Sequence, residues 1–318
     1  MNELHVQEKA LLRQMRQAGF RPASQIPLEE SRQGLARMAV AMAAPKVSVG
    51  RIEDRRIPGP GGELLIRIYR PDREGQDSEP VALYFHGGGF YLGDLETHDH
   101  VCRFLCKAAD IIVIAVDYRL APENKFPAAV DDCYAALCWV SERGEAEGFD
   151  AKRIALVGDS AGGSLVASIC FLARDRGGPR IGYQVMIYPA LAMDDGADFP
   201  SRKALGSGEY FIAQEDFAFF RALYFHEPEK EMANPLASPI RAKDFSNLPP
   251  ALIVAAEYDP CRDENEKYAE LLKAAGVQVE YVCFEGTIHP FFLFDGVLDS
   301  GREGQALVAD RVRGRLKR

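Results

Sequence analysis

Apolar residues in the middle of the chain form short continuous runs, and the stretches between them carry apolar residues every three or four positions. Continuous runs bounded by turn residues are typical of strands buried on both faces, and the wider spacing is typical of amphipathic helices. This pattern predicts strands at 81–85, 111–116, 153–157 and 183–187, separated by helices at 99–109, 128–143 and 164–174. Buried strands that alternate with helices predict an α/β fold whose mostly parallel sheet is covered on both faces.

The same alternation returns near the C-terminus, with strands predicted at 251–256 and 277–284 and helices at 263–275 and 301–316. Upstream, residues 51–57 and 63–69 surround the turn Pro58-Gly59-Pro60-Gly61-Gly62. Two short strand candidates around such a turn predict a hairpin, which we expect at the antiparallel edge of the sheet. Residues 4–18 and 27–42 have the apolar spacing of helices.

Between residues 192 and 247 the alternation stops. The segment is rich in aromatic residues but contains no run that fits a buried strand. A helical insertion between two sheet strands is placed to cover the carboxyl ends of the strands, where open α/β sheets bind their ligands. Its aromatic side chains either line such a site or pack the segment together, and the sequence leaves both roles open.

Charge and cysteine content limit the partners and the compartment. The 318 residues carry a net charge of −9, which argues against nucleic acid or an anionic membrane as the main partner. The first residues lack the apolar core of a signal peptide, and no apolar run is long enough to span a membrane. The seven cysteines are odd in number and contain no CxxC pair, which favours reduced thiols in a cytoplasmic protein.

The sequence Gly158-Asp159-Ser160-Ala161-Gly162 follows a predicted strand and precedes a predicted helix. This order is the nucleophile elbow, in which a tight turn exposes a serine hydroxyl next to backbone N–H groups. Gly-rich turns of this kind also bind phosphate or serve only as packing turns. No Lys-Ser or Lys-Thr follows the glycines, so a Walker loop is excluded. Ser160 is therefore the candidate nucleophile.

A serine nucleophile needs a base to take its proton and an acid to orient the base. On this topology the acid and then the base follow the serine along the chain, each after a later strand. Asp259 follows strand 251–256, and His289 follows strand 277–284. Asp263 is a rival acid whose place in the first turn of a helix suits capping better. Glu257 precedes the strand end, which suits a structural or supporting role.

Backbone donors for an oxyanion are expected at His86-Gly87-Gly88-Gly89-Phe90, directly after strand 81–85. A triple glycine alone is more often a flexible turn, but here it lies where the topology requires the donors. We expect the N–H groups of Gly87, Gly88 and Ala161 to form the oxyanion hole. His86 is expected to order the loop rather than to act as a base.

A second cluster of polar residues is formed by His98, His100, Cys102 and Cys106. Spacings of two and four on one predicted helix cannot aim all four side chains at a single metal, and no second ligand pair is present. Capping and packing explain the cluster better than zinc does. We expect neither a metal nor a cofactor.

Together these motifs resemble the hormone-sensitive-lipase-type (bacterial family IV) esterases of the α/β-hydrolase superfamily. The matching segments are residues 86–90, 117–123, 126–131, 158–163 and 257–264. The resemblance implies an α/β-hydrolase fold with an eight-stranded sheet. Residues 46–191 and 248–318 would form the core, residues 1–45 N-terminal cap helices and residues 192–247 a cap insertion. It also implies a serine carboxylesterase that hydrolyses small, short- to medium-chain esters through an acyl-enzyme without a cofactor. A homodimer through the sheet edge near the last strand is implied as well.

Two residues depart from the family pattern, because Pro290 follows His289 where the family usually has glycine and Cys261 replaces an aliphatic residue. Pro290 removes an N–H and stiffens the base loop, and Cys261 is expected to act as a small hydrophobe. One alternative is a related hydrolase of amide, lactone or carbamate bonds. Another is a non-catalytic receptor, like the plant gibberellin receptors, which resemble this family but lack the base histidine. Here the serine, acid and histidine are all present.

Overall fold

The strands of this chain form a single sheet in the order β1-β2-β4-β3-β5-β6-β7-β8 in the computed structural model, which describes residues 2–73, 78–194 and 199–317. They are β1 (Arg51–Gly59), β2 (Gly62–Arg70), β3 (Glu79–Phe85), β4 (Ile112–Val116), β5 (Phe149–Asp159), β6 (Tyr183–Ile187), β7 (Ala251–Tyr258) and β8 (Val279–Ile288). Strand β2 pairs antiparallel with both β1 and β4, and all other pairs are parallel. The predicted mostly parallel sheet with a hairpin at its edge is confirmed.

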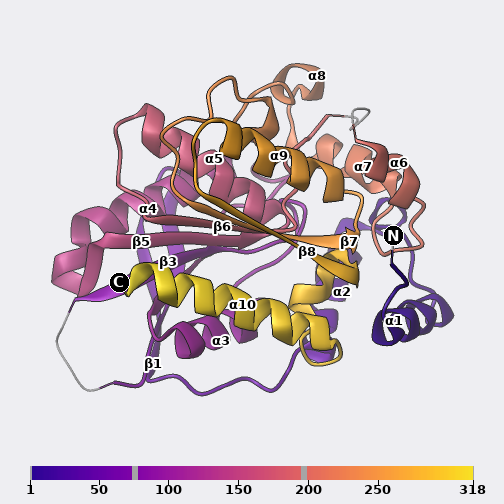
Figure 1. Cartoon of the computed structure of the whole chain (residues 1–318), viewed down its shortest axis with the longest axis horizontal. Coiled ribbons are helices and arrows are strands. Elements are labelled where there is room, and N and C mark those ends of the chain that lie inside the picture. Colours follow the sequence, from indigo (N-terminus) through magenta and orange to yellow (C-terminus); the bar gives the residue numbers. More distant parts are fainter. Residues whose placement is uncertain (1, 74–77, 195–198, 318) are drawn as a thin grey trace.

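Helices cover both faces of this sheet (Figure 1). They are α3 (Asp99–Ala109), α4 (Ala128–Glu147), α5 (Ala161–Asp175), α9 (Arg262–Ala274) and α10 (Asp299–Leu316). One apolar core joins α4, α5 and α9 to the sheet, and a second joins α3 and α10 to its other face. Strands β3 to β7 are almost wholly buried between these two cores, which is why they appear in the sequence as continuous apolar runs.

The remaining helices gather beyond the strand ends, at the right of Figure 1. They are α1 (Val6–Gln17), α2 (Leu28–Met42), α6 (Pro200–Leu205), α7 (Gln214–Tyr224) and, further toward the top, α8 (Pro228–Glu231). The short 3-10 turns η1 (Ala23–Gln25), η2 (Pro239–Arg241) and η3 (His289–Leu293) complete the chain. Within the described part of residues 192–247 there is no strand of the sheet, as predicted.

Several predicted elements are longer in the structure, and the difference matters at the strand ends. Strand β5 continues to Asp159 because Gly158 and Asp159 pair with the last residues of β6. Helix α5 follows at Ala161, three residues earlier than predicted. Strand β8 continues to Ile288, which pairs with Tyr258 of β7. The polar and glycine residues at these ends are poor strand or helix formers alone and are held by their neighbours.

Helix α1 is attached to the C-terminal part of the chain. The His5 N–H donates to the carbonyl of Gly286 at 3.0 Å, and Glu8, which is fully buried, accepts a hydrogen bond from the Ser300 hydroxyl at 2.7 Å. The apolar face of the helix, formed by Leu11 and Leu12 among others, joins the core that contains α3 and α10. The N-terminal helix is thus an integral part of the packed structure.

Candidate active site

Ser160 lies between β5 and α5 with φ 53° and ψ −119°, a conformation that side-chain-bearing residues rarely adopt. The turn is held by the Ser160 N–H, which donates to the carbonyl of Ile187 at 2.8 Å. A Cβ on Gly162 would lie 1.9 Å from the carbonyl oxygen of Phe85, and one on Gly158 would lie 2.4 Å from that of Gly162. Only glycine fits at both positions, so the sequence enforces the turn sterically.

The three residues predicted as nucleophile, base and acid lie in hydrogen-bond contact. Nε2 of His289 is 2.8 Å from the Ser160 hydroxyl, and Nδ1 is 2.7 Å from Oδ2 of Asp259. Asp259 follows β7 and is fully buried, and His289 follows β8 and is 5 % exposed. A carboxylate on Nδ1 fixes the proton there, so Nε2 is left to accept the proton of the serine. The arrangement can generate an alkoxide nucleophile.

The rival acids lie outside this chain of contacts. Oδ2 of Asp263 accepts the Ser201 N–H at 2.8 Å, so this side chain joins the insertion to α9. Asp263 lies in the first turn of α9, as expected, where a carboxylate is favourable, although the N-cap residue Cys261 makes no side-chain hydrogen bond there. Glu257 accepts the backbone N–H groups of Asn2 and Gly286, both at 2.7 Å, which is a structural role.

The structure differs from the sequence-based expectation at Gly87. Its N–H donates to Oδ1 of Asp159 at 3.0 Å and is therefore not free for an oxyanion. Within the described chain, the N–H groups of Gly88, Gly89 and Ala161 have no protein acceptor. Gly88 and Gly89 have φ values of 120° and 59°, which glycine adopts readily. Ala161 is the first residue of α5, where backbone N–H groups have no partner within the helix.

Asp159 holds the glycine loop at residues 87–89 in place, a role that its sequence context did not predict. Its Oδ1 accepts the Tyr84 hydroxyl at 2.8 Å as well as the Gly87 N–H, and Nε2 of His98 lies 3.4 Å away. Burial tends to raise the pKa of Asp159, but the nearby His98 and the hydrogen bond from Tyr84 hold this pKa below its usual range. The carboxylate stays charged and anchors the glycine loop.

His86 orders the same loop, as expected. Its Nδ1 is 2.8 Å from the carbonyl of Gly87, and its ring stacks on Tyr118 with centroids 4.2 Å apart. Burial, and next the nearby His98, lower the pKa of His86 to about 4, so the ring is neutral near pH 7. A neutral, fully packed imidazole that contacts backbone supports the loop.

The side chains of the cluster His98, His100, Cys102 and Cys106 do not meet at one common position. His98 contacts Thr97 and Asp159, whereas His100 contacts the carbonyl of Leu293 at 3.2 Å. Cys102 and Cys106, also on α3, are buried in the core between this helix and the sheet. Among the described residues, the only three metal-binding side chains with ligand atoms within 4.8 Å of one another are Asp259, Cys261 and His289. Two of these three are already hydrogen-bonded to each other.

A cavity of about 280 Å³ opens above Ser160 and His289. Its apolar walls come from the N-terminal segment, the insertion and the loop after His289; they include Phe20, Ile26, Leu35, Met38, Phe211, Ile212, Phe217, Phe220, Leu293 and Phe294. The two roles left open for the insertion's aromatic residues are both used. Phe211, Phe217 and Phe220 line the cavity, whereas Tyr224 and Phe225 are buried in the core.

The two residues that depart from the family pattern also line this cavity. Cys261 is 1 % exposed, and burial raises the pKa of its thiol well above the usual range. The thiol is therefore neutral, as expected of a small hydrophobe. Pro290 lies in η3, next to the candidate base.

Comparisons with known proteins identify the fold and the class of enzyme that this chain resembles. A family model described as alpha/beta hydrolase fold matches residues 82–293. Esterase LipI of Mycobacterium tuberculosis is 44 % identical over 267 residues, which cover 82 % of this chain and 82 % of the relative. An arylesterase of Saccharolobus solfataricus is 40 % identical over 252 residues, covering 79 % and 80 %. The solved structure of a hyperthermophilic esterase from the archaeon Pyrobaculum calidifontis is 42 % identical with a TM-score of 0.92, covering 98 % of this chain and 99 % of that one.

Proposed function

Because this chain belongs to the hormone-sensitive-lipase-type branch of the α/β-hydrolase fold family and is a carboxylic ester hydrolase, we propose that Ser160, His289 and Asp259 are its catalytic triad. The observation that carries this proposal is the continuous line of contacts from the Ser160 hydroxyl through His289 to Asp259, at 2.8 Å and 2.7 Å. The fixed order of donors and acceptors along this line gives each residue one role.

In the proposed mechanism the Ser160 oxygen attacks the ester carbonyl carbon while its proton moves to Nε2 of His289. The negative charge that develops on the carbonyl oxygen is stabilised by the N–H groups of Gly88, Gly89 and Ala161, each worth ~2.7–4 kcal/mol. His289 then gives its proton to the departing alkoxide, which leaves as an alcohol. The acyl group remains on Ser160.

Deacylation repeats these steps with water as the nucleophile. His289 takes a proton from the water, whose oxygen attacks the acyl carbon, and then returns the proton to Ser160 as the carboxylic acid leaves. Asp259 remains ionised throughout and stabilises the imidazolium that forms in both halves. The reaction needs only groups of this chain and water.

We further propose that residues 1–45 and 192–247 form a cap that limits the length of the substrate. Its walls include Leu35 and Met38 of α2 and Phe217 and Phe220 of α7, so acyl or alkyl chains would be buried against apolar side chains. Each buried methylene contributes ~0.8 kcal/mol, about fourfold in kcat/KM, until the cavity is full. Leu35→Ala and Met38→Ala should widen the cavity and extend this rise to longer chains, while Ser160 still reacts with a small organophosphate.

Ser160→Ala tests the proposed nucleophile. We expect the variant to fold normally and to lose all measurable turnover of p-nitrophenyl butyrate, because its methyl side chain leaves no cavity in the core. A phosphonate inhibitor should add once to the wild-type protein, at Ser160, by mass spectrometry, and not to the variant. Ser207→Ala, in the insertion, is the matched control and should keep both properties. Hydrolysis by the Ser160→Ala variant would refute the mechanism.

The assembly and the compartment are proposed on separate grounds. Strand β8 lies at the free edge of the sheet, which supports the homodimer that the resemblance implies. All seven cysteines are unpaired thiols, which supports a reducing compartment such as the cytoplasm. In the part of the chain that the structure describes, no helix has the length and apolar character needed to cross a bilayer. Light scattering at two protein concentrations tests the dimer.

A further inference from the structure

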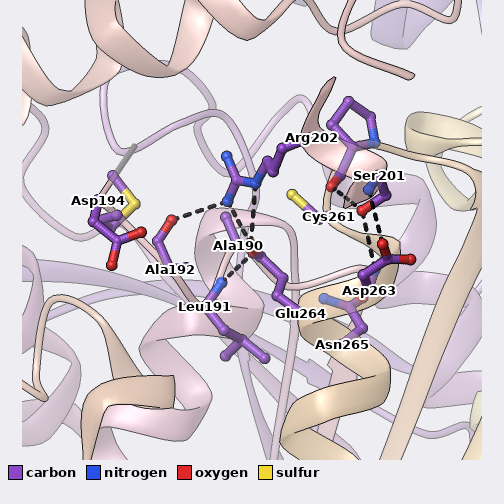
Figure 2. A network of polar contacts seen from close by, with 12 residues as sticks. Ala190, Leu191, Ala192, Asp194, Ser201, Arg202, Cys261, Asp263, Glu264 and Asn265 are labelled. Carbon is purple, nitrogen blue, oxygen red and sulfur yellow. Dashed lines mark hydrogen bonds and ion pairs between the residues drawn. The ribbon is translucent and has the colours of Figure 1, made fainter. Parts of the chain in front are cut away.

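A buried ion pair joins the cap insertion to the helix that follows Asp259. Nη2 and Nε of Arg202, on α6, both point at Oε2 of Glu264, on α9; the distances are 2.6 Å and 3.1 Å (Figure 2). The side chains are 2 % and 0 % exposed. Two opposite charges are thus held out of water next to the site, on elements far apart in sequence.

Each member of the pair also holds a third element. Oε1 of Glu264 accepts the N–H of Leu191 at 2.7 Å, and Nη2 of Arg202 donates to the carbonyl of Ala192 at 2.9 Å (Figure 2). Leu191 and Ala192 belong to the segment that follows β6. The guanidinium also lies 3.6 Å from the ring centroid of Phe217, which is part of the cavity wall. The pair therefore connects the insertion, the end of β6 and the substrate cavity.

Ser201, the neighbour of Arg202, holds the turn that carries Asp259. Its hydroxyl donates to the carbonyl of Pro260 at 2.7 Å, and its N–H donates to Oδ2 of Asp263 at 2.8 Å. The Asp263 N–H in turn approaches the Ser201 hydroxyl at 3.2 Å (Figure 2). Residues 260, 263 and 264 lie within five positions of Asp259. Each of them is hydrogen-bonded to Ser201 or Arg202 of α6.

A buried ion pair is a poor source of stability, because desolvation of both charges offsets most of their attraction. The pKa of Glu264 illustrates this cost: burial raises it, and Arg202 only partly counters the effect. Apolar side chains of similar size would fill the same space at least as well. Apolar side chains cannot supply directional hydrogen bonds. The hydrogen bonds of Arg202 and Glu264 to each other, to Leu191 and to Ala192 fix the positions of α6, α9 and the segment after β6 relative to one another.

We propose that Arg202 and Glu264 are positioning residues that hold the turn after β7, so that the Asp259 carboxylate stays aligned with Nδ1 of His289. This inference rests on the proposed triad. Because Asp259 is fully buried and bonded to the Cys261 N–H at 2.8 Å in the same turn, a shift of that turn moves the carboxylate with it. A misplacement of about 1 Å in a catalytic group can lower turnover on the order of 10²-fold.

Arg202→Met is the first test. We expect kcat for p-nitrophenyl acetate to fall by about 10- to 100-fold with KM within about threefold, since the reacting groups rather than ester binding are disturbed. The far-downfield proton NMR signal of the Nδ1–H of His289, which reports its bond to Asp259, should weaken or shift. Arg311→Met is the matched control, because Arg311 also pairs with a glutamate through Nε and Nη2, at 2.8 and 2.9 Å from the two carboxylate oxygens of Glu280, but on the protein surface. It should leave kcat and the NMR signal unchanged.

The double variant Arg202→Met/Glu264→Met separates positioning from simple charge compensation. With both charges removed, the midpoint of thermal unfolding should recover to that of the wild type or above, whereas kcat should stay low. The double variant also carries the test if Arg202→Met alone does not fold. Recovery of kcat in the double variant, or a normal kcat and NMR signal in Arg202→Met, would overturn the inference.

The parallel assay of Ser160→Ala keeps this inference apart from the proposed function. An inactive wild-type protein, or an active Ser160→Ala variant, would refute the triad itself. An active wild type with an inactive Ser160→Ala variant and an unimpaired Arg202→Met variant would refute only the positioning role.

Discussion

Asp259→Asn keeps the shape of the side chain and changes only which of its two terminal atoms can accept a hydrogen bond. In the structure Oδ1 accepts the Cys261 N–H at 2.8 Å, and Oδ2 lies 2.7 Å from Nδ1 of His289. An amide has one acceptor and one donor at these positions. It must therefore turn its NH₂ group either toward His289 or toward Cys261.

Both orientations disable the base. With NH₂ toward His289, Nδ1 becomes the acceptor and the proton sits on Nε2, which can no longer take the proton of Ser160. With NH₂ toward Cys261, two donors face each other in a fully buried site, and an unpaired buried donor costs about 1–3 kcal/mol. In either case the anion that stabilises the imidazolium is gone. We expect kcat to fall on the order of 10⁴-fold, equivalent to about 5 kcal/mol.

The assay is steady-state hydrolysis of a p-nitrophenyl ester, with active sites counted by a phosphonate titrant. Asp263→Asn is the comparison, because its amide oxygen can still accept the Ser201 N–H. Loss of at most one net hydrogen bond predicts a decrease of no more than about tenfold. An Asp259→Asn variant within tenfold of the wild type, or a larger loss in Asp263→Asn, would show that the acid is misassigned.

Three further predictions concern stability and specificity. Gly162→Ala should lower the free energy of unfolding in urea by about 3 kcal/mol or more, because its Cβ would lie 1.9 Å from the Phe85 carbonyl oxygen. Gly314→Ala in α10 is the control: beyond its chain neighbours and the backbone of its own helix, its Cβ would meet no atom within 4 Å, so stability should rise by about 0.5–1 kcal/mol. Equal effects of the two variants would refute the steric argument. Burial, and next Asp94, raise the pKa of Asp117 to about 6, so its ionisation destabilises the fold as pH rises from about 4 to 6. At pH 8, Asp117→Asn should then be more stable than the wild type by less than about 3 kcal/mol, because solvent screening reduces the effect. Below pH 4 the two proteins should be equally stable. A stability difference that grows on acidification would contradict this. In a p-nitrophenyl acyl series, kcat/KM should rise about fourfold per methylene and then fall when the cavity is full, whereas a steady rise to long chains would contradict the cap assignment.

The sheet, and the contact of Ser160 with His289 and of His289 with Asp259, were predictable because their requirements lie in short stretches of sequence. Strands buried on both faces need continuous apolar runs, and the elbow admits only glycine at positions 158 and 162. The order of serine, acid and histidine after successive strands then follows from the topology. Family membership, fold and ester hydrolysis are confirmed. The roles of Ser160, Asp259 and His289 remain predictions, although the structure brings these residues into contact.

The parts that sequence reasoning missed depend on contacts between distant segments. The direction of the Gly87 N–H is set by Asp159, which lies 72 positions further along the chain. The contact of Asp263 with Ser201, and that of Glu264 with Arg202, exist only because the insertion folds over α9. No local spacing rule pairs such residues. The local sequence does not mark Arg202 or Glu264, because each lies beside another charged residue, Lys203 or Asp263.

The attachment of α1 to the far end of the chain has a consequence for synthesis. The Glu8 contact with Ser300 spans 292 positions, so at roughly 5–20 residues per second the ribosome delivers the partner about 15 to 60 s after Glu8. During that interval the core that Leu11, Leu12 and Met15 join is incomplete, since it also includes residues 288–316. His289 is delivered in the same late stretch. Under the proposed mechanism the nascent chain cannot cleave esters before His289 has been made, and helix α1 is meanwhile exposed to chaperones and to aggregation.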